Sequence, residues 1–135
     1  MKIAVRYYTR SGNTEKLAKA IAEAVGVQAA SVSASLSEKV DVLFLGCSYY
    51  AFDVDEAVKH FIAENKGNVG RIVCFGTSAM MKSTQKPMKK VCDEAGIPLA
   101  AEEFHCWGAF GPMHKGRPGA EDLKKAAAFA RQLVK

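Results

Sequence analysis

Residues 2–25 combine a short strand-like run, a polar turn and an amphipathic helix, and this order constrains the fold more than any other stretch. Residues 2–8 are apolar and aromatic enough to form a largely buried strand. Leu17, Ile21 and Val25 then follow at helical spacing, with alanines on the same face. A strand that leads through a tight turn into a helix predicts an α/β protein. It also places backbone N–H groups and the positive end of the helix dipole at the turn.

The turn between strand and helix is rich in hydroxyl and amide side chains. Its residues are Thr9, Arg10, Ser11, Gly12, Asn13 and Thr14. Capping a helix requires only one such residue, and Gly12 adds the backbone freedom to turn closely around a ligand. The turn has neither the Gly-Lys-Ser/Thr end of a Walker A loop nor the three glycines of a dinucleotide-binding turn. We therefore expect these residues to hold a phosphate group, mainly through backbone N–H groups and hydroxyls.

The rest of the chain repeats the alternation of apolar runs and helical patterns. Further strands are predicted at residues 27–32, 40–46, 71–75 and 99–107, and further helices at 54–65, 87–95 and 120–134. The runs at 40–46 and 71–75 lack strict alternation, as expected for parallel strands covered on both faces. Residues 33–39 form a polar connection with room for one helical turn. This pattern predicts a doubly wound parallel sheet of five strands in the order 2-1-3-4-5, with helices on both faces.

Length and composition limit the class of protein. The 135 residues suit one domain, residues 1–135, with a real core, and 49% hydrophobic residues is ordinary for a globular protein. No apolar run approaches the ~20 residues of a membrane span, and the first strand begins without room for a signal peptide. We therefore expect a cytoplasmic protein that does not associate with membranes.

Cysteine usage indicates the cellular compartment, and net charge indicates the kind of partner. The four cysteines are Cys47, Cys74, Cys92 and Cys106. Their spacing fits no metal site, so we expect buried free thiols in a reducing compartment. The net charge is +5 and the pI about 9.1, but the lysines are scattered and form no basic run. We therefore expect acidic protein partners rather than nucleic acid.

The pattern Thr-x-Ser-Gly-Asn-Thr directly after the first strand resembles the phosphate loop of flavodoxins. The resemblance extends over the whole chain, although the first loop is its most specific part. It implies a flavodoxin-like fold that binds flavin mononucleotide (FMN) noncovalently, with the 5′-phosphate in the loop at residues 9–14. Two further loops then enclose the isoalloxazine ring. The implied contacts are Ser48, Tyr49, Tyr50 and Ala51 in the second loop, and Gly76, Thr77, Ser78, Ala79 and Met80 in the third.

The side chains of these two loops suggest different roles. Tyr49 and Tyr50 are candidates for stacking on the ring, or else they pack over the sheet edge. The third loop lacks the aromatic residue often found there, and Met80 is either a soft apolar cover or a core residue.

Trp107 ends the last predicted strand near the same edge, as a ring neighbour or as an ordinary core or surface residue. Arg6 lies in a strand expected to be buried, so its guanidinium must reach a carboxylate or the sheet edge.

The resemblance implies an FMN-binding electron-transfer protein without a catalytic side chain, because the flavin performs the redox chemistry. One alternative is an FMN-dependent NAD(P)H:quinone or nitro-compound reductase, with residues 108–118 as part of its pocket. A second alternative is a flavodoxin-like interaction module without flavin. Oxidation of NAD(P)H by the protein alone would favour the reductase. A protein that stays colourless after addition of FMN would favour the module. The oligomeric state stays open.

Overall fold

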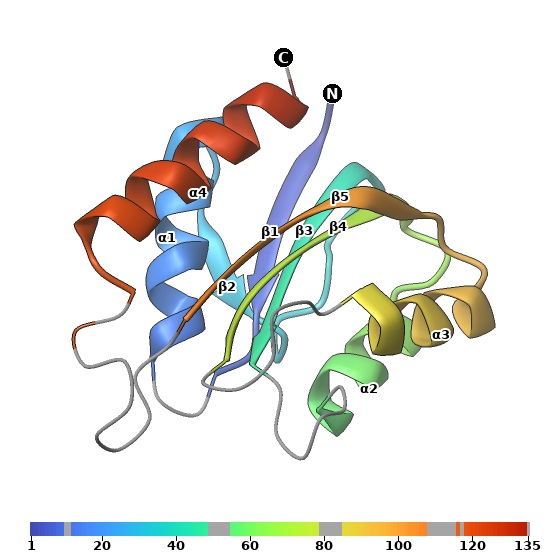
Figure 1. Ribbon diagram of the computed structural model, residues 1–135. Helices are drawn as coiled ribbons and strands as arrows, with labels where there is room; N and C mark the ends of the chain where they lie inside the picture. Colours follow the sequence, from blue (N-terminus) through green and yellow to red (C-terminus); the bar gives the residue numbers. More distant parts are fainter. Residues whose placement is uncertain (10–11, 49–54, 79–84, 108–115, 117, 135) are drawn as a thin grey trace.

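In the residues that it describes, the computed structural model contains five parallel strands and four helices (Figure 1). It describes residues 1–9, 12–48, 55–78, 85–107, 116 and 118–134. The strands are β1 (Ile3–Tyr7), β2 (Ala29–Ser31), β3 (Val40–Ser48), β4 (Val69–Ser78) and β5 (Leu99–Trp107). The helices are α1 (Asn13–Val25), α2 (Glu56–Glu64), α3 (Gln85–Ala95) and α4 (Ala120–Leu133). The strand order β2-β1-β3-β4-β5 confirms the doubly wound, flavodoxin-like fold class predicted from the sequence.

The central strands separate two apolar cores. Leu43 and Leu45 of β3 pack with α2 and α3, whereas Val42 and Phe44 pack with α1 and α4. Strand β4 repeats this alternation with Ile72 and Cys74 on the first face, and Val73 and Phe75 on the second. Figure 1 shows the same division, with α1 and α4 on one side of the sheet and α2 and α3 on the other. Burial on both faces explains why these runs are continuously apolar.

The strand ends differ from the prediction because of pairing with neighbours. Strands β3 and β4 run to Ser48 and Ser78, beyond the predicted ends, since Ser48 pairs with Thr77 and Ser78 pairs with Trp107. At the edge of the sheet, β2 is only three residues long instead of six. It pairs with β1 alone, and its alanine and serine side chains add little packing.

The helix ends also shift by one or two residues. Helix α1 begins at Asn13, so Asn13 and Thr14, which the sequence places at the end of the polar turn, belong to its first turn. Helix α2 begins only at Glu56, because the side chain of Asp55 caps it by accepting a hydrogen bond of 3.0 Å from the N–H of Ala57. Pro87 lies in the first turn of α3, where backbone N–H groups have no intrahelical acceptor, so the N–H that proline lacks costs the helix no hydrogen bond.

Three thiols confirm the prediction of buried free cysteines. Cys74, Cys92 and Cys106 are buried and unbridged, and burial raises the pKa of the Cys92 thiol to about 11. The side chain of Cys47 lies outside the described part of the structure. Among the described helices, none has both the length and the apolar character to cross a membrane.

The connection from β2 to β3 is an irregular segment rather than a helix. A turn closes where the N–H of Ala34 donates to the carbonyl of Ser31 at 3.0 Å, and the predicted room for a helical turn is not used. Arg6 reaches this segment, because its Nε donates to the carbonyl of Ala34 at 2.9 Å and its Nη1 to the carbonyl of Val5 at 3.1 Å. Its acceptors are therefore backbone carbonyls beside the edge strand, and partial burial lowers its pKa.

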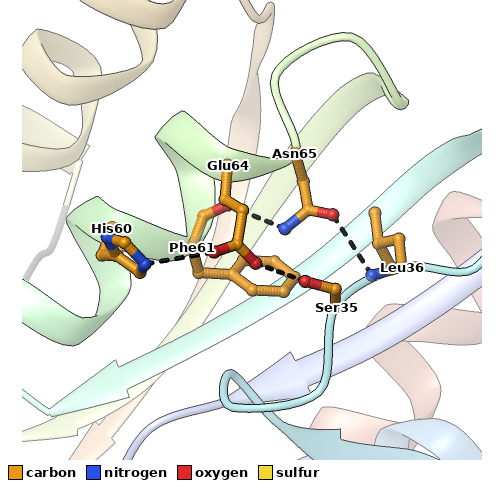
Figure 2. A network of polar contacts seen from close by, with 6 residues as sticks. All are labelled: Ser35, Leu36, His60, Phe61, Glu64 and Asn65. Carbon is orange, nitrogen blue, oxygen red and sulfur yellow. Dashed lines mark hydrogen bonds and ion pairs between the residues drawn. The ribbon is translucent and has the colours of Figure 1, made fainter.

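Asn65, just after α2, fastens this connection to the helix (Figure 2). Its side chain is only 3% exposed, donates to the carbonyl of Phe61 at 2.9 Å and accepts from the N–H of Leu36 at 3.2 Å. On the exposed side, Glu64 accepts from the hydroxyl of Ser35 and pairs with His60 at 3.1 Å. The bond from Ser35, and then the nearby His60, lower the pKa of Glu64. Asn65 is the buried centre of a network whose other polar side chains are exposed.

Replacement of the buried amide should therefore cost more than replacement of its exposed neighbour. We expect Asn65→Ala to lower the free energy of unfolding by about 1–3 kcal/mol, because the partly buried N–H of Leu36 loses its acceptor and the buried carbonyl of Phe61 loses a donor. Asn65→Asp keeps an acceptor but places a largely buried carboxylate against the carbonyl of Phe61 at the C-terminal end of α2, so it should not restore the lost stability. Ser35→Ala is the control and should change stability by less than about 0.5 kcal/mol. Chemical denaturation measures all three, and equal losses for Asn65→Ala and Ser35→Ala would contradict the assignment.

Candidate functional site

The carboxyl ends of β1, β3 and β4 meet at one edge of the sheet (Figure 1). Strand order changes direction between β1 and β3, so this edge contains the switch point at which open α/β sheets bind ligands. The register places Tyr7 beside Gly46, and Ser48 beside Thr77. The loops that follow these three strands therefore leave the sheet next to one another.

The loop after β1 enters α1 through a left-handed glycine. Gly12 has φ 88° and ψ −3°, a conformation that other residues rarely adopt. Its N–H donates to Oγ1 of Thr9 at 3.0 Å, and its carbonyl accepts from the N–H of Lys16 at 3.3 Å, so Gly12 is the N-cap. A glycine cap has no side chain to accept from the first N–H groups of the helix. The N-cap of α1 is therefore a glycine, and not the Ser, Thr or Asn residue that usually caps a helix.

The first helical turn is tied to β4 by a pair of hydroxyls. Asn13 is 8% exposed and Thr14 is fully buried. Oγ1 of Thr14 lies 3.1 Å from Oγ1 of Thr77, which is itself buried. The prediction placed the Thr14 hydroxyl on the phosphate, and the structure brings this hydroxyl to the third loop. Helix α1 therefore begins at a fixed position relative to the ends of β3 and β4.

Gly46 is a site residue that the sequence analysis missed. A Cβ atom added there would lie 2.3 Å from Cε2 of Phe75 and 2.9 Å from Cγ2 of Thr14. Phe75 thus occupies the space above Gly46, and the start of α1 rests beside it. A glycine inside an apolar strand often marks a close approach of this kind, and that signal was present in the sequence.

The described part of the site has no charged side chain. Thr9, Gly12, Asn13, Thr14, Gly46, Gly76 and Thr77 are hydroxyl, amide or glycine residues. Glu15 follows in the first turn of α1, where its carboxylate pairs with Lys19 at 2.9 Å. An anion at this edge would be held by backbone N–H groups, hydroxyls and the helix dipole.

The structure places about half of the predicted contacts at this edge. It describes Thr9, Gly12, Asn13, Thr14, Gly76 and Thr77, together with the backbone of Ser48 and Ser78. Arg10, Ser11, Tyr49, Tyr50, Ala51, Ala79 and Met80 lie outside the described residues, and their roles stay predictions. The same holds for the side chain of Trp107 and for most of residues 108–118.

Comparisons with known proteins establish the fold. No family model matches the sequence. The chain is 26% identical to an uncharacterized protein of Methanocaldococcus jannaschii, with 91% of both chains covered. Among solved structures, a flavodoxin from the domain Archaea superimposes with a TM-score of 0.75 at 18% identity, covering 99% of this chain and 96% of that one. A short-chain flavodoxin associated with a non-canonical PDU bacterial microcompartment gives a TM-score of 0.73 at 20% identity, covering 99% and 97%.

The close contact at Gly46 predicts a large effect of a single methyl group. We expect Gly46→Ala to lower the free energy of unfolding by roughly 1–3 kcal/mol, because the new Cβ overlaps the Phe75 ring. Gly67→Ala is the matched control, since a Cβ there meets nothing within 4 Å. It should be neutral or stabilising by up to about 1 kcal/mol. Phe75→Leu should recover part of the Gly46→Ala loss in the double variant. Equal stabilities of the two glycine variants in denaturant would refute the contact.

Proposed function

We propose that this protein binds FMN noncovalently at the carboxyl edge of β1, β3 and β4 and carries electrons between partner proteins. The flavodoxin-like fold supports the proposal. The observation that carries it is the turn from Thr9 to Gly12, which opens α1 with a left-handed glycine at the switch point. Such a turn suits a phosphate and is more elaborate than a helix cap requires.

The described residues of the first loop fit a phosphate through N–H groups and hydroxyls. The first N–H groups of α1 and the helix dipole face this edge, and Gly12 lets the backbone approach a ligand closely. The hydroxyl of Thr9 accepts a bond from Gly12 and can still donate its own hydrogen. In the proposal, Arg10, Ser11 and Asn13 complete the loop, and the Thr14–Thr77 contact keeps it at a constant distance from the third loop.

The second and third loops would hold the flavin ring. Since Ser48 and Thr77 pair in the sheet, the two loops begin side by side and flank one space. We assign Tyr49 and Tyr50 to stacking, Ser48 and Ala51 to the second-loop backbone, and residues 76–80 to contacts with the ring edge. When bound, the flavin supplies the redox chemistry, while these residues bind it, orient it and exclude water.

The charge of the chain indicates its partners. At a net charge of +5, encounter with acidic protein surfaces is favoured and with basic ones opposed. We therefore propose redox partners with acidic patches, and a cytoplasmic location that suits the free, buried thiols.

Selective loss of FMN over riboflavin tests the phosphate loop. We expect Thr9→Val and Ser11→Ala each to weaken FMN binding by roughly ten- to a hundredfold, because a hydrogen bond to a charged group contributes about 1.5–3 kcal/mol. Riboflavin, which lacks the phosphate, should be much less affected. Ser37→Ala removes an exposed hydroxyl next to Glu38, which pairs with Lys2 at the opposite, amino edge of the sheet, and serves as the control. Quenching of flavin fluorescence gives both affinities.

Three results would contradict parts of this assignment. Equal losses for FMN and riboflavin would place the phosphate elsewhere. A protein that binds no FMN at all would be an interaction module rather than a carrier. Steady oxidation of NAD(P)H by the FMN-loaded protein alone, with a quinone or nitro compound as acceptor, would identify a reductase.

A further inference from the structure

A groove with a volume of about 690 Å³ lies between α2 and α3. These two helices cover the face of the sheet opposite α1 and α4 (Figure 1). The apolar lining of the groove consists of Ile62, Ala63, Pro87, Val91 and Ala95. Its charged lining consists of Lys59, Lys66, Lys86, Lys90 and Glu94. An apolar floor between basic rims distinguishes this groove from the edge that we assign to FMN, whose described residues have no charged side chain.

Each rim of the groove contributes two lysines. Lys59 and Lys66 lie seven residues apart on the α2 side, and Lys86 and Lys90 lie one turn apart on α3. Lys66, Lys86 and Lys90 are exposed, while Lys59 is half-buried and 3.4 Å from Glu56. With Glu94 as the one carboxylate of the lining, the groove is strongly positive. Its charge complements an acidic partner.

One end of the groove adjoins the proposed FMN site. Lys59 lies in the first turn of α2 and Lys86 in the first turn of α3. Helix α2 follows β3 and helix α3 follows β4, so both begin on the side where these strands end. A partner in this groove would therefore extend toward the edge that carries the flavin.

We propose that the groove between α2 and α3 docks an acidic amphipathic helix of a redox partner. The partner's role in electron transfer rests on the function proposed above, whereas the docking itself does not. Lys86 and Lys90 lie one turn apart on α3, about 6 Å along its axis, which matches the spacing of carboxylates one turn apart on a docked helix. Its apolar side chains would cover Ala63 and Val91, and carboxylates on its flanks would meet the lysines of both rims.

A designed peptide serves as the probe. It has 14 residues, leucine and alanine along one helical face, glutamate on both flanks and blocked ends. Titration into the full ¹⁵N-labelled chain without flavin should give saturable shifts at residues 56–66 and 85–95. A scrambled peptide of the same composition, with its apolar residues dispersed around the helix, should bind at least about tenfold more weakly. Binding of the designed peptide should weaken as salt rises.

Matched variants separate the groove from the overall charge. Lys66→Glu with Lys90→Glu should weaken binding by at least about tenfold. Lys16→Glu with Lys124→Glu changes the net charge equally with exposed lysines of α1 and α4, and should change the affinity less than about twofold. Ala63→Gln fills the groove without a change of charge and should also weaken binding. Ala128→Gln, at an exposed position of α4, should not. Thermal melts confirm that each variant is folded.

Several outcomes would overturn the proposal. These are equal weakening by the two charge-reversal pairs, equal binding of the scrambled peptide, shifts centred on α1 and α4, or no saturable binding at millimolar peptide. Displacement by citrate at constant ionic strength would indicate a small-anion site instead. The FMN titration keeps the two proposals apart. Binding of the peptide without binding of FMN would refute the proposed carrier function and support the docking groove. Binding of FMN without binding of the peptide would support the FMN site and refute the docking groove.

Discussion

The approach of α1 to the sheet at Gly46 is the contact on which the arrangement of the loops depends. The absence of a side chain at Gly46 leaves room for the Phe75 ring and for the methyl group of Thr14. Thr14 then reaches Thr77, so one helix start is fixed against two neighbouring strands at once. A protein interior is packed too densely for such a contact to shift without displacing its neighbours. The same packing that completes the core therefore sets the relative position of the first and third loops.

The other face of the sheet is built differently. Its cover is completed by the irregular connection after β2, which Asn65 and Arg6 attach through backbone groups. Leu36 from this connection packs against the core that α2 and α3 cover. With the connection filling the space over β1, α2 and α3 lie over the remaining part of this face and leave a groove between them. The face covered by α1 and α4 thus fixes where the first and third loops begin, and the face covered by α2 and α3 provides the groove that we propose for docking.

The sequence was sufficient for the fold because the alternation of apolar runs and helical patterns is a property of whole segments. Strand order, parallel pairing and the place of the first loop all follow from it. The details that it could not supply depend on contacts between distant residues. The partner of Thr14 is 63 positions away, and the acceptors of Arg6 include a carbonyl in an irregular segment. Element ends shifted for the same reason, since a strand such as β4 continues as long as its neighbours offer hydrogen bonds.

The distribution of charge suggests how one small domain could separate the two binding tasks that we propose for it. At the carboxyl edge, attraction of an anion comes from N–H groups and the helix dipole, whose influence fades within the first turn. In the groove, attraction comes from lysines, whose field in physiological salt extends over about 8 Å. Salt and partner surfaces can therefore change docking strongly while they change the hold on a phosphate little. In the two proposals taken together, the described residues of the FMN site attract an anion without a charged side chain, and the groove attracts an acidic partner through lysines. Such a division would let the chain exchange partners and still retain its cofactor.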